Sequence, residues 1–149
     1  MVLNSVGWEL TMPGQKWDGL DSPRIKCRGE QMRVIVAGAV AWSDAHAIRR
    51  ELSKIPIGAT VIHGDCAGAD IIAGQVAREM GFAVEAMNKN EEDYTKYGHE
   101  AWKGLNERML ASGARLVIVF HPSVANSHGS KHMIELAQAA NVEVRSFSN

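Results

Sequence analysis

Short apolar runs alternate with amphipathic stripes along most of this chain, which has 149 residues. The runs predict buried strands at 34–37, 60–63, 82–86, 116–120 and 142–144. Between the runs, apolar residues recur at helical spacing and predict helices at about 45–55, 69–80, 99–110 and 133–140. This alternation predicts an α/β fold, a three-layer sandwich whose mostly parallel five-stranded sheet carries helices on both faces.

Capping residues mark several of the predicted helix ends. Ser43 or Asp44 is expected to cap the first helix, and Gly81 to stop the second. The polar stretch 88–97 has no apolar stripe, so we expect a connecting segment there, with the third helix starting at about His99.

Residues 1–31 differ from the rest of the chain. They are polar and glycine-rich and show no period, yet they contain Trp8 and Trp17. We interpret this stretch as an N-terminal extension that docks on the domain or on a second subunit. We therefore expect residues 32–149 to form the ligand-binding domain and the protein to be a homo-oligomer.

Composition narrows the class of function. Sixteen basic residues face seventeen acidic ones, so no long-range positive field favours nucleic acid or an anionic membrane surface. No apolar run approaches the ~20 residues of a membrane-spanning helix, and the first residues lack the pattern of a secretory signal. We expect a cytoplasmic protein. Its two cysteines make neither a disulfide framework nor a structural zinc site.

The most informative motif is the strand-to-helix turn at residues 61–70. Gly64 and Gly68 bracket the turn, and glycines let a backbone come close to a ligand. The helix that follows presents N–H groups and a positive dipole end. Because parallel sheets bind ligands beyond the carboxyl ends of their strands, we expect a small-molecule site there. The loops that would form it are 38–44, 64–70, 87–97 and 121–130.

Four side chains in and around this turn have two interpretations each. Asp70 and Asp65 are either contacts to a ribose, and candidate catalytic acids, or acids that favour the helix start. His63 is either a general acid/base or a structural hydrogen-bonding residue. Cys66 is either a reactive thiol or, as we favour, a small residue that fits a tight loop.

The first loop follows Gly38 and lacks a dinucleotide fingerprint, and the chain has no P-loop. Trp42 in this loop either stacks on a base or packs before the helix cap; we favour packing. In the fourth loop, Ser127, Gly129 and Ser130 precede a helix without an acid in its first turn, which favours phosphate binding.

Three histidines in the same region, His121, His128 and His132, raise the question of a metal. Their spacing matches no familiar metal site, so we interpret them as loop histidines. The sequence predicts neither a metal nor a cofactor.

Several of these pieces together resemble the SLOG superfamily, named for the Smf/DprA and LOG proteins, and within it the small YspA-like branch. The resemblance covers about residues 33–147, and its strongest element is His63-Gly64 followed by Gly68-Ala69-Asp70. Further matches are residues 33–38, 97–98, Asn106 with Met109, and Gly129-Ser130 with Met133. The resemblance implies a Rossmann-like sheet and a nucleotide-type ligand lying across Gly38, His63–Asp70 and Gly129-Ser130.

The chain departs from the family pattern at three positions. Val40 and Leu105 stand where the branch commonly has arginines, and Met133 stands where the phosphoribohydrolases have a glutamate. Arg108 or Arg78 would compensate for the missing charge.

Three functions follow from this resemblance. The one we favour is binding of a nucleotide, cyclic nucleotide or NAD-derived small molecule by a sensor or sequestering protein, because binding needs only the glycine turns and helix starts. The alternative is hydrolysis of the N-glycosidic bond of nucleoside monophosphates, with Asp70 or Asp65 as the acid. A lesser alternative is a DNA-processing accessory protein.

Overall fold

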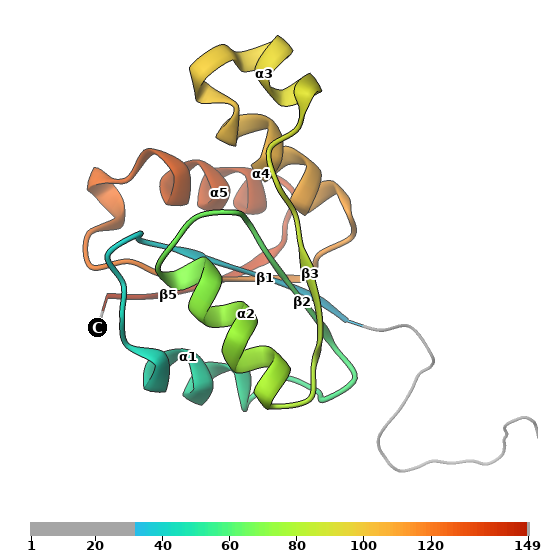
Figure 1. Cartoon of the computed structure of the whole chain (residues 1–149), viewed down its shortest axis with the longest axis vertical. Coiled ribbons are helices and arrows are strands. Elements are labelled where there is room, and N and C mark those ends of the chain that lie inside the picture. Colours follow the sequence, from blue (N-terminus) through green and yellow to red (C-terminus); the bar gives the residue numbers. More distant parts are fainter. Residues whose placement is uncertain (1–31, 149) are drawn as a thin grey trace, which may run out of the picture. The chain divides into compact units, whose positions relative to one another are not determined.

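The computed structural model describes residues 32–148, and the predicted extension at 1–31 lies outside them. The described chain alternates strands and helices (Figure 1). The strands are β1 (Arg33–Gly38), β2 (Thr60–His63), β3 (Ala83–Ala86), β4 (Leu116–Phe120) and β5 (Glu143–Phe147). The α-helices are α1 (Ala45–Leu52), α2 (Ala69–Glu79), α3 (Glu91–Tyr97), α4 (Trp102–Ala111) and α5 (His128–Ala139). Two short 3-10 turns, Gly98–Glu100 and Val124–Asn126, precede α4 and α5.

All five strands run parallel, in the order β3-β2-β1-β4-β5. The chain starts in the middle strand, moves outward through β2 and β3, and then crosses to β4 and β5 on the other side. The carboxyl ends of β1 and β4 therefore flank the topological switch point, where such sheets bind ligands.

Alternate residues of the central strands form two apolar layers, which confirms the predicted α/β sandwich. Val34 and Val36 face α1 and α2, whereas Ile35 faces α4 and α5. Figure 1 shows the two helix pairs on opposite faces of the sheet, with α3 beyond α4. Burial on both faces explains why β4 has a continuous apolar sequence, and all four residues of β2 are buried too; both strands have the predicted bounds.

The polar stretch at 88–97 contains a helix that the prediction missed. Helix α3 has no apolar stripe, but Asn90 and Asp93 form a capping box at its start, with both hydrogen bonds at 2.9 Å. Asp93 is also buried and pairs with Arg108 of α4. Local capping and one ion pair therefore hold a helix that periodicity does not reveal.

Other predicted boundaries shift by a few residues. The last strand runs from Glu143 to Phe147 instead of 142–144, because pairing with β4 extends it and Phe147 stacks on Phe120. Helix α1 ends at Leu52, and Asp44 rather than Ser43 caps it, accepting a hydrogen bond from the Ala47 amide at 3.1 Å. No helix among the described residues is long and apolar enough to cross a membrane.

Candidate functional site

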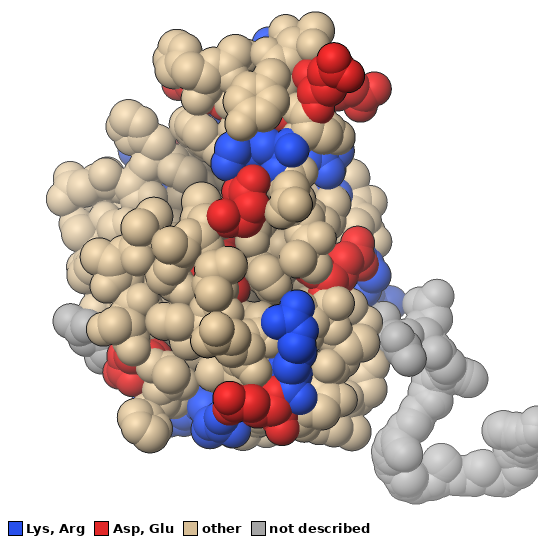
Figure 2. All heavy atoms as spheres, in the orientation of Figure 1, with Lys and Arg blue, Asp and Glu red and all other residues tan. Residues whose placement is uncertain are grey.

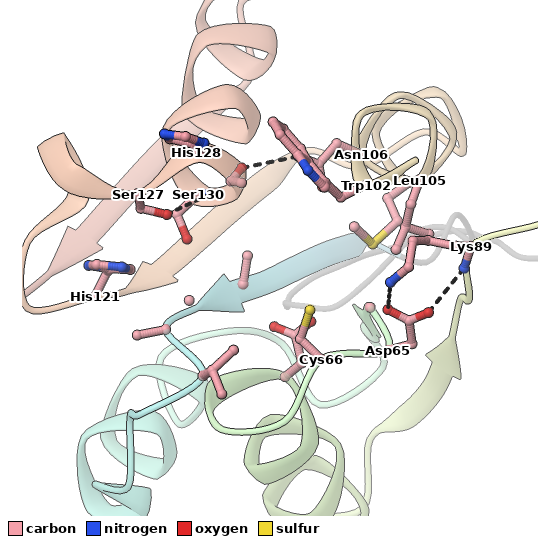
Figure 3. Close-up of a pocket in the computed structure, with 18 residues that line it drawn as sticks. Asp65, Cys66, Lys89, Trp102, Leu105, Asn106, His121, Ser127, His128 and Ser130 are labelled. Atoms are coloured by element: carbon pink, nitrogen blue, oxygen red, sulfur yellow. Dashed lines mark hydrogen bonds and ion pairs between the residues drawn. The ribbon is translucent and has the colours of Figure 1, made fainter. Parts of the chain in front are cut away.

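A pocket of about 340 Å³ opens at the carboxyl end of the sheet. This volume lies at the lower end of the range for small-molecule sites. Its walls come from the ends of β1, β2 and β4, the segment after β3, α4 and the start of α5 (Figure 3). The pocket therefore lies at the switch point between β1 and β4, where the alternating pattern predicts a ligand site.

Two glycines let the loops around the pocket come together. A Cβ on Gly38 would lie 2.1 Å from the Phe120 carbonyl oxygen. The end of β1 can therefore lie this close to the end of β4 only because residue 38 is a glycine. Gly68 has a φ of 74°, and a Cβ there would lie 2.2 Å from the Val40 carbonyl oxygen. These contacts bring the β1–α1 loop and the β2–α2 turn together.

The start of α2 carries an acid to the pocket, and one of its first-turn amides is engaged within the protein. The Ala69 amide donates to the Ala39 carbonyl at 3.1 Å, so it is not available to a ligand. Asp70 lines the pocket and is only 7% exposed. Burial raises the pKa of Asp70 to about 7, although backbone hydrogen bonds from Cys66 and Gly64 oppose this shift. Asp70 is thus a pocket carboxyl group that titrates near neutral pH.

The second acid, Asp65, is held by Lys89. The Lys89 Nζ lies 2.9 Å from Asp65 Oδ1, and the Lys89 amide donates to Oδ2 at 3.1 Å (Figure 3). Burial would raise the pKa of Asp65, but the hydrogen bonds and charge of Lys89 outweigh it and lower that pKa. The hydrogen bond to Asp65 also raises the pKa of Lys89. Both groups are therefore charged at neutral pH and neutralise each other.

Cys66 lies between the two acids in sequence and lines the same wall. Burial and the nearby Asp70 carboxyl raise the pKa of its thiol. A raised pKa disfavours the nucleophilic thiolate, which agrees with the interpretation of Cys66 as a small residue in a tight turn.

Across the pocket, the first turn of α5 supplies hydrogen-bond donors. The helix begins at His128, so Gly129 and Ser130 lie inside its first turn instead of before it, because Ser127 is the cap. The Ser127 hydroxyl accepts a hydrogen bond from the Ser130 amide at 3.1 Å. The amides of His128 and Gly129 belong to the first turn, where the helix itself offers N–H groups no acceptor. The Ser130 side chain is buried and lines the pocket, and its hydroxyl bonds to no other described residue.

His121 lies at the same end of the pocket (Figure 3). Its Nδ1 accepts a hydrogen bond from the Ser123 amide at 2.8 Å, so the neutral ring carries its proton on Nε2. With no acid in the first turn of α5, this end of the pocket presents donors and the positive end of a helix dipole.

Asn106 joins α4 to α5 at the pocket wall. Its amide nitrogen bonds to the Gly129 carbonyl oxygen and to His132 Nδ1, each at 3.1 Å. Trp102 packs edge-on against the His132 ring, and burial lowers the pKa of His132. Because both amide hydrogens of Asn106 are engaged, only its oxygen remains to accept from a ligand.

Eight of the predicted ligand-binding residues line the pocket together: Gly38, Gly64, Asp65, Asp70, Asn106, Ser127, Gly129 and Ser130. The other five do not line it. Gly68 and Ala69 shape the turn behind the wall, as described above. Trp42, His63 and Arg108 have structural partners instead.

Those three side chains are placed as follows. Trp42 is 5% exposed, packs on Phe120 and donates to the Asp44 carbonyl at 3.0 Å. His63 is 4% exposed; its Nδ1 lies 2.7 Å from the Gly64 carbonyl oxygen, and its Nε2 has no partner among the described residues. Arg108 pairs with buried Asp93, 2.5 Å from Oδ2, and donates to the Asn88 carbonyl at 2.7 Å.

Besides Cys66, His121 and His128, seven residues of the lining were not among the predicted ligand contacts. Lys89 is the most consequential, because it is the one lysine or arginine among the described lining residues. The sequence does contain a signal for a pocket position here: Lys89 is the first charged residue after β3, in a loop at the carboxyl edge of the sheet. The others form mostly apolar wall: Ala37, Ala39, Val40, Trp102, Leu105 and Met109.

The three positions that depart from the family pattern lie in two parts of the structure, the pocket wall and the apolar layer under α5. Val40 and Leu105 line the pocket, so apolar groups stand where the branch commonly has arginines. Met133 is fully buried in the layer between the sheet and α5. Among the described residues, no group of three or more His, Cys, Asp or Glu is arranged to hold a metal ion.

The fold and the pocket define a Rossmann-like α/β domain with a pocket at its switch point. The family model for the YspA, cpYpsA-related SLOG family matches residues 32–94. The chain is also 32% identical over 124 residues to the Gene 61 protein of Mycobacterium phage D29, covering 78% of this chain and 97% of that protein. The chain belongs to the YspA-related SLOG family, as the sequence resemblance predicts.

Among solved structures, the chain is similar to DNA processing protein A (DprA) from Streptococcus pneumoniae. The TM-score is 0.60 at 17% identity, over 78% of this chain. The chain spans about half the length of that protein, because the match covers 50% of it. At this identity the likeness confirms the fold alone.

Proposed function

We propose that this protein binds a nucleotide or nucleotide-derived small molecule, as a sensor or a sequestering protein. The observation that carries the proposal is the pocket at the switch point, whose lining includes both the donors at the start of α5 and the Asp70 carboxyl group. Donors at a helix start suit a phosphate, and carboxylates suit sugar hydroxyls or an amino group. Membership in the SLOG family agrees with a nucleotide-related role.

The experiment that tests the proposal is mass spectrometry of small molecules released from the natively purified full chain after denaturation. We expect a nucleotide-derived compound in stoichiometric amount from the wild-type protein. The Gly129→Glu variant, which adds a negative charge to the first turn of α5, is expected to release none of it. A compound without phosphate or sugar would contradict the proposal.

A second candidate function is hydrolysis of an N-glycosidic bond. The observation that favours it is Asp70, a buried pocket carboxyl group whose pKa of about 7 suits general acid/base work at neutral pH. Against it, Asp65 is engaged by Lys89, and the family's glutamate position is the buried Met133.

The test of this second function is release of free base from nucleoside monophosphates, followed by chromatography at high protein concentration. Activity that is lost in Asp70→Asn while ligand binding persists would establish hydrolysis. Absence of any released base would leave binding as the function.

The DNA-processing alternative is not supported by the surface. Lys and Arg side chains are interspersed with Asp and Glu on the described part of the face in Figure 2, and the pI is about 6.6. A salt-sensitive band shift on single-stranded DNA would revive this alternative. The predicted homo-oligomer is tested by light scattering of the full chain and of a chain without residues 1–31, and an unchanged oligomeric state would exclude the extension as an assembly element.

A further inference from the structure

We infer that Asp70 selects a ligand carrying a positive charge at the end opposite its phosphate. The chemical class is a nucleotide whose heterocycle is cationic, as in an N-ribosylated pyridinium. This inference rests on the proposed function, because it specifies the ligand of the same pocket.

The charges around the pocket are divided between two ends. In Figure 3, Ser127, Ser130, His121 and His128 lie on one side, and Asp65, Cys66 and Lys89 lie on the other. The α5 side presents N–H and hydroxyl donors with no acid in its first turn. The side of the β2–α2 turn carries two carboxyl groups and one lysine. A ligand that matches both ends has an anion at one end and a cation at the other.

Lys89 does not remove the negative charge of Asp70, because it is engaged elsewhere. Its side chain and its backbone amide both bond to Asp65. The loop around it is held as well, since the Asn88 carbonyl accepts from Arg108 and Asn90 caps α3. Lys89 therefore stays with Asp65, and the two charges cancel.

Asp70 is therefore the pocket carboxyl group that has no cationic partner among the described residues. It is only 7% exposed, and no ion pair to it forms among the described residues. Two backbone amides, from Gly64 and Cys66, are its hydrogen-bond donors. A carboxylate buried beside apolar Leu105 and Met109 is costly without a cation, and a cationic ligand would supply one.

The test compares two probes that differ in one charge. Nicotinamide mononucleotide has a positively charged ring, and its reduced form has the same ribose and phosphate with an uncharged ring. Both are titrated into the ligand-free full chain by calorimetry at pH 8, where Asp70 is largely ionised, with AMP as a third probe. The groups facing Asp70 at this pH are Asp65, Lys89 and Cys66, with His121 and His128 across the pocket.

We expect the wild-type protein to bind the charged form at least tenfold more tightly than the reduced form. Asp70→Asn should bind both forms with equal affinity. Lys89→Met, which leaves Asp65 uncompensated, should keep or increase the preference, whereas Asp65→Asn should reduce it. Lys54→Met is the matched control, because Lys54 also pairs with an acid, Glu51, at 3.1 Å but lies outside the pocket.

Two results would overturn the inference while leaving the proposed function intact. One is equal affinity of the wild-type protein for the two forms, or tighter binding of AMP than of either. The other is a preference that survives in Asp70→Asn. If the wild-type protein binds none of the three probes and no other nucleotide, the proposed function itself fails, and the inference fails with it.

Discussion

The carboxyl group of Asp70 lies against the backbone of Gly64, so closely that a Cβ on Gly64 would come within 2.9 Å of Asp70 Oδ2. The glycine that ends the β2 strand and the acid that begins α2 therefore form one unit of the pocket wall. The close approach buries the carboxyl group and gives it amide donors in place of water.

Stability should depend on pH through Asp70. Its pKa is raised from 3.8 to about 7, so the folded protein holds a proton that the unfolded chain has lost between these pH values. The contribution of Asp70 to stability is therefore greatest below about pH 4, decreases as the pH rises to about 7 and then levels off. The shift corresponds to a decrease of about 4 kcal/mol. Urea unfolding of ligand-free protein across this pH range measures it, and Asp70→Asn should lack this decrease. Parallel curves for the two proteins would contradict the prediction.

A negative charge placed in the first turn of α5 should block ligand binding without harming the fold. Gly129 has no atom within 4 Å of an added Cβ, and an acid at a helix start stabilises by about 0.3–1 kcal/mol. Gly129→Glu should therefore unfold no earlier than the wild-type protein, yet bind AMP at least tenfold more weakly by calorimetry. Gly129→Ala is the matched control and should bind normally. Equal affinities of the two variants would exclude α5 as the anion site.

Arg108 should stabilise the folded protein by holding α3 against α4. It pairs with Asp93, which is 4% exposed, and its hydrogen bond lowers the pKa of that carboxyl group. Arg108→Met leaves a buried carboxylate without its partner and should lower the free energy of unfolding by about 3 kcal/mol at neutral pH. Because the pKa of Asp93 is lowered, this difference should shrink as the pH falls through the acid range.

The control for Arg108 is Lys96, which also links α3 to α4. It pairs with Glu107 at 3.5 Å, but its side chain is 67% exposed. Lys96→Met should cost clearly less than Arg108→Met, because an exposed ion pair contributes little to stability. Similar losses for the two variants in denaturant titrations would refute the assignment of a structural role to Arg108.

The effect of Gly74→Ala on the free energy of unfolding should depend on whether the His63 side chain is present. A Cβ on Gly74 would lie 2.6 Å from His63 Nε2, so Gly74→Ala should destabilise the protein by about 1–3 kcal/mol through overpacking. In a His63→Ala background the clash is absent, and the same change should be neutral or stabilise α2 by up to about 1 kcal/mol. A double-mutant cycle of unfolding free energies measures the coupling. Additive effects would mean that the ring and the helix do not press on each other.

Much of the fold could be predicted because its signals are local. The bounds of β4 follow from a continuous apolar run and those of β2 from the run that ends before Gly64, and Gly81 adopts the positive φ of 92° expected after a helix. Helix α3 was not predicted, because it has no apolar stripe; its local signal is the capping box of Asn90 and Asp93, and the ion pair that also holds it joins Asp93 to Arg108, 15 residues away. Nothing in the local pattern indicates such a pair.

Only part of the pocket lining could be predicted from the sequence. The positions of Gly64, Asp70 and Ser130 follow from strand ends and helix starts, which lie at one edge of any parallel sheet. The partnership of Lys89 with Asp65 spans 24 residues and depends on how two loops meet. The sequence shows the charge of Arg108, which is expected to compensate for the missing pocket charge, but not that Asp93 pairs with it.

Thermal unfolding of the ligand-free full chain against a panel of nucleotides and ADP-ribose derivatives tests the central claim most directly. A ligand that binds the folded state alone at a hundredfold excess over its Kd stabilises by about 2.7 kcal/mol. For a chain of this size, that corresponds to a rise in Tm of about 5–10 °C. The account predicts such a rise with at least one compound and its loss in Gly129→Glu. An unchanged Tm with every compound of the panel would contradict it.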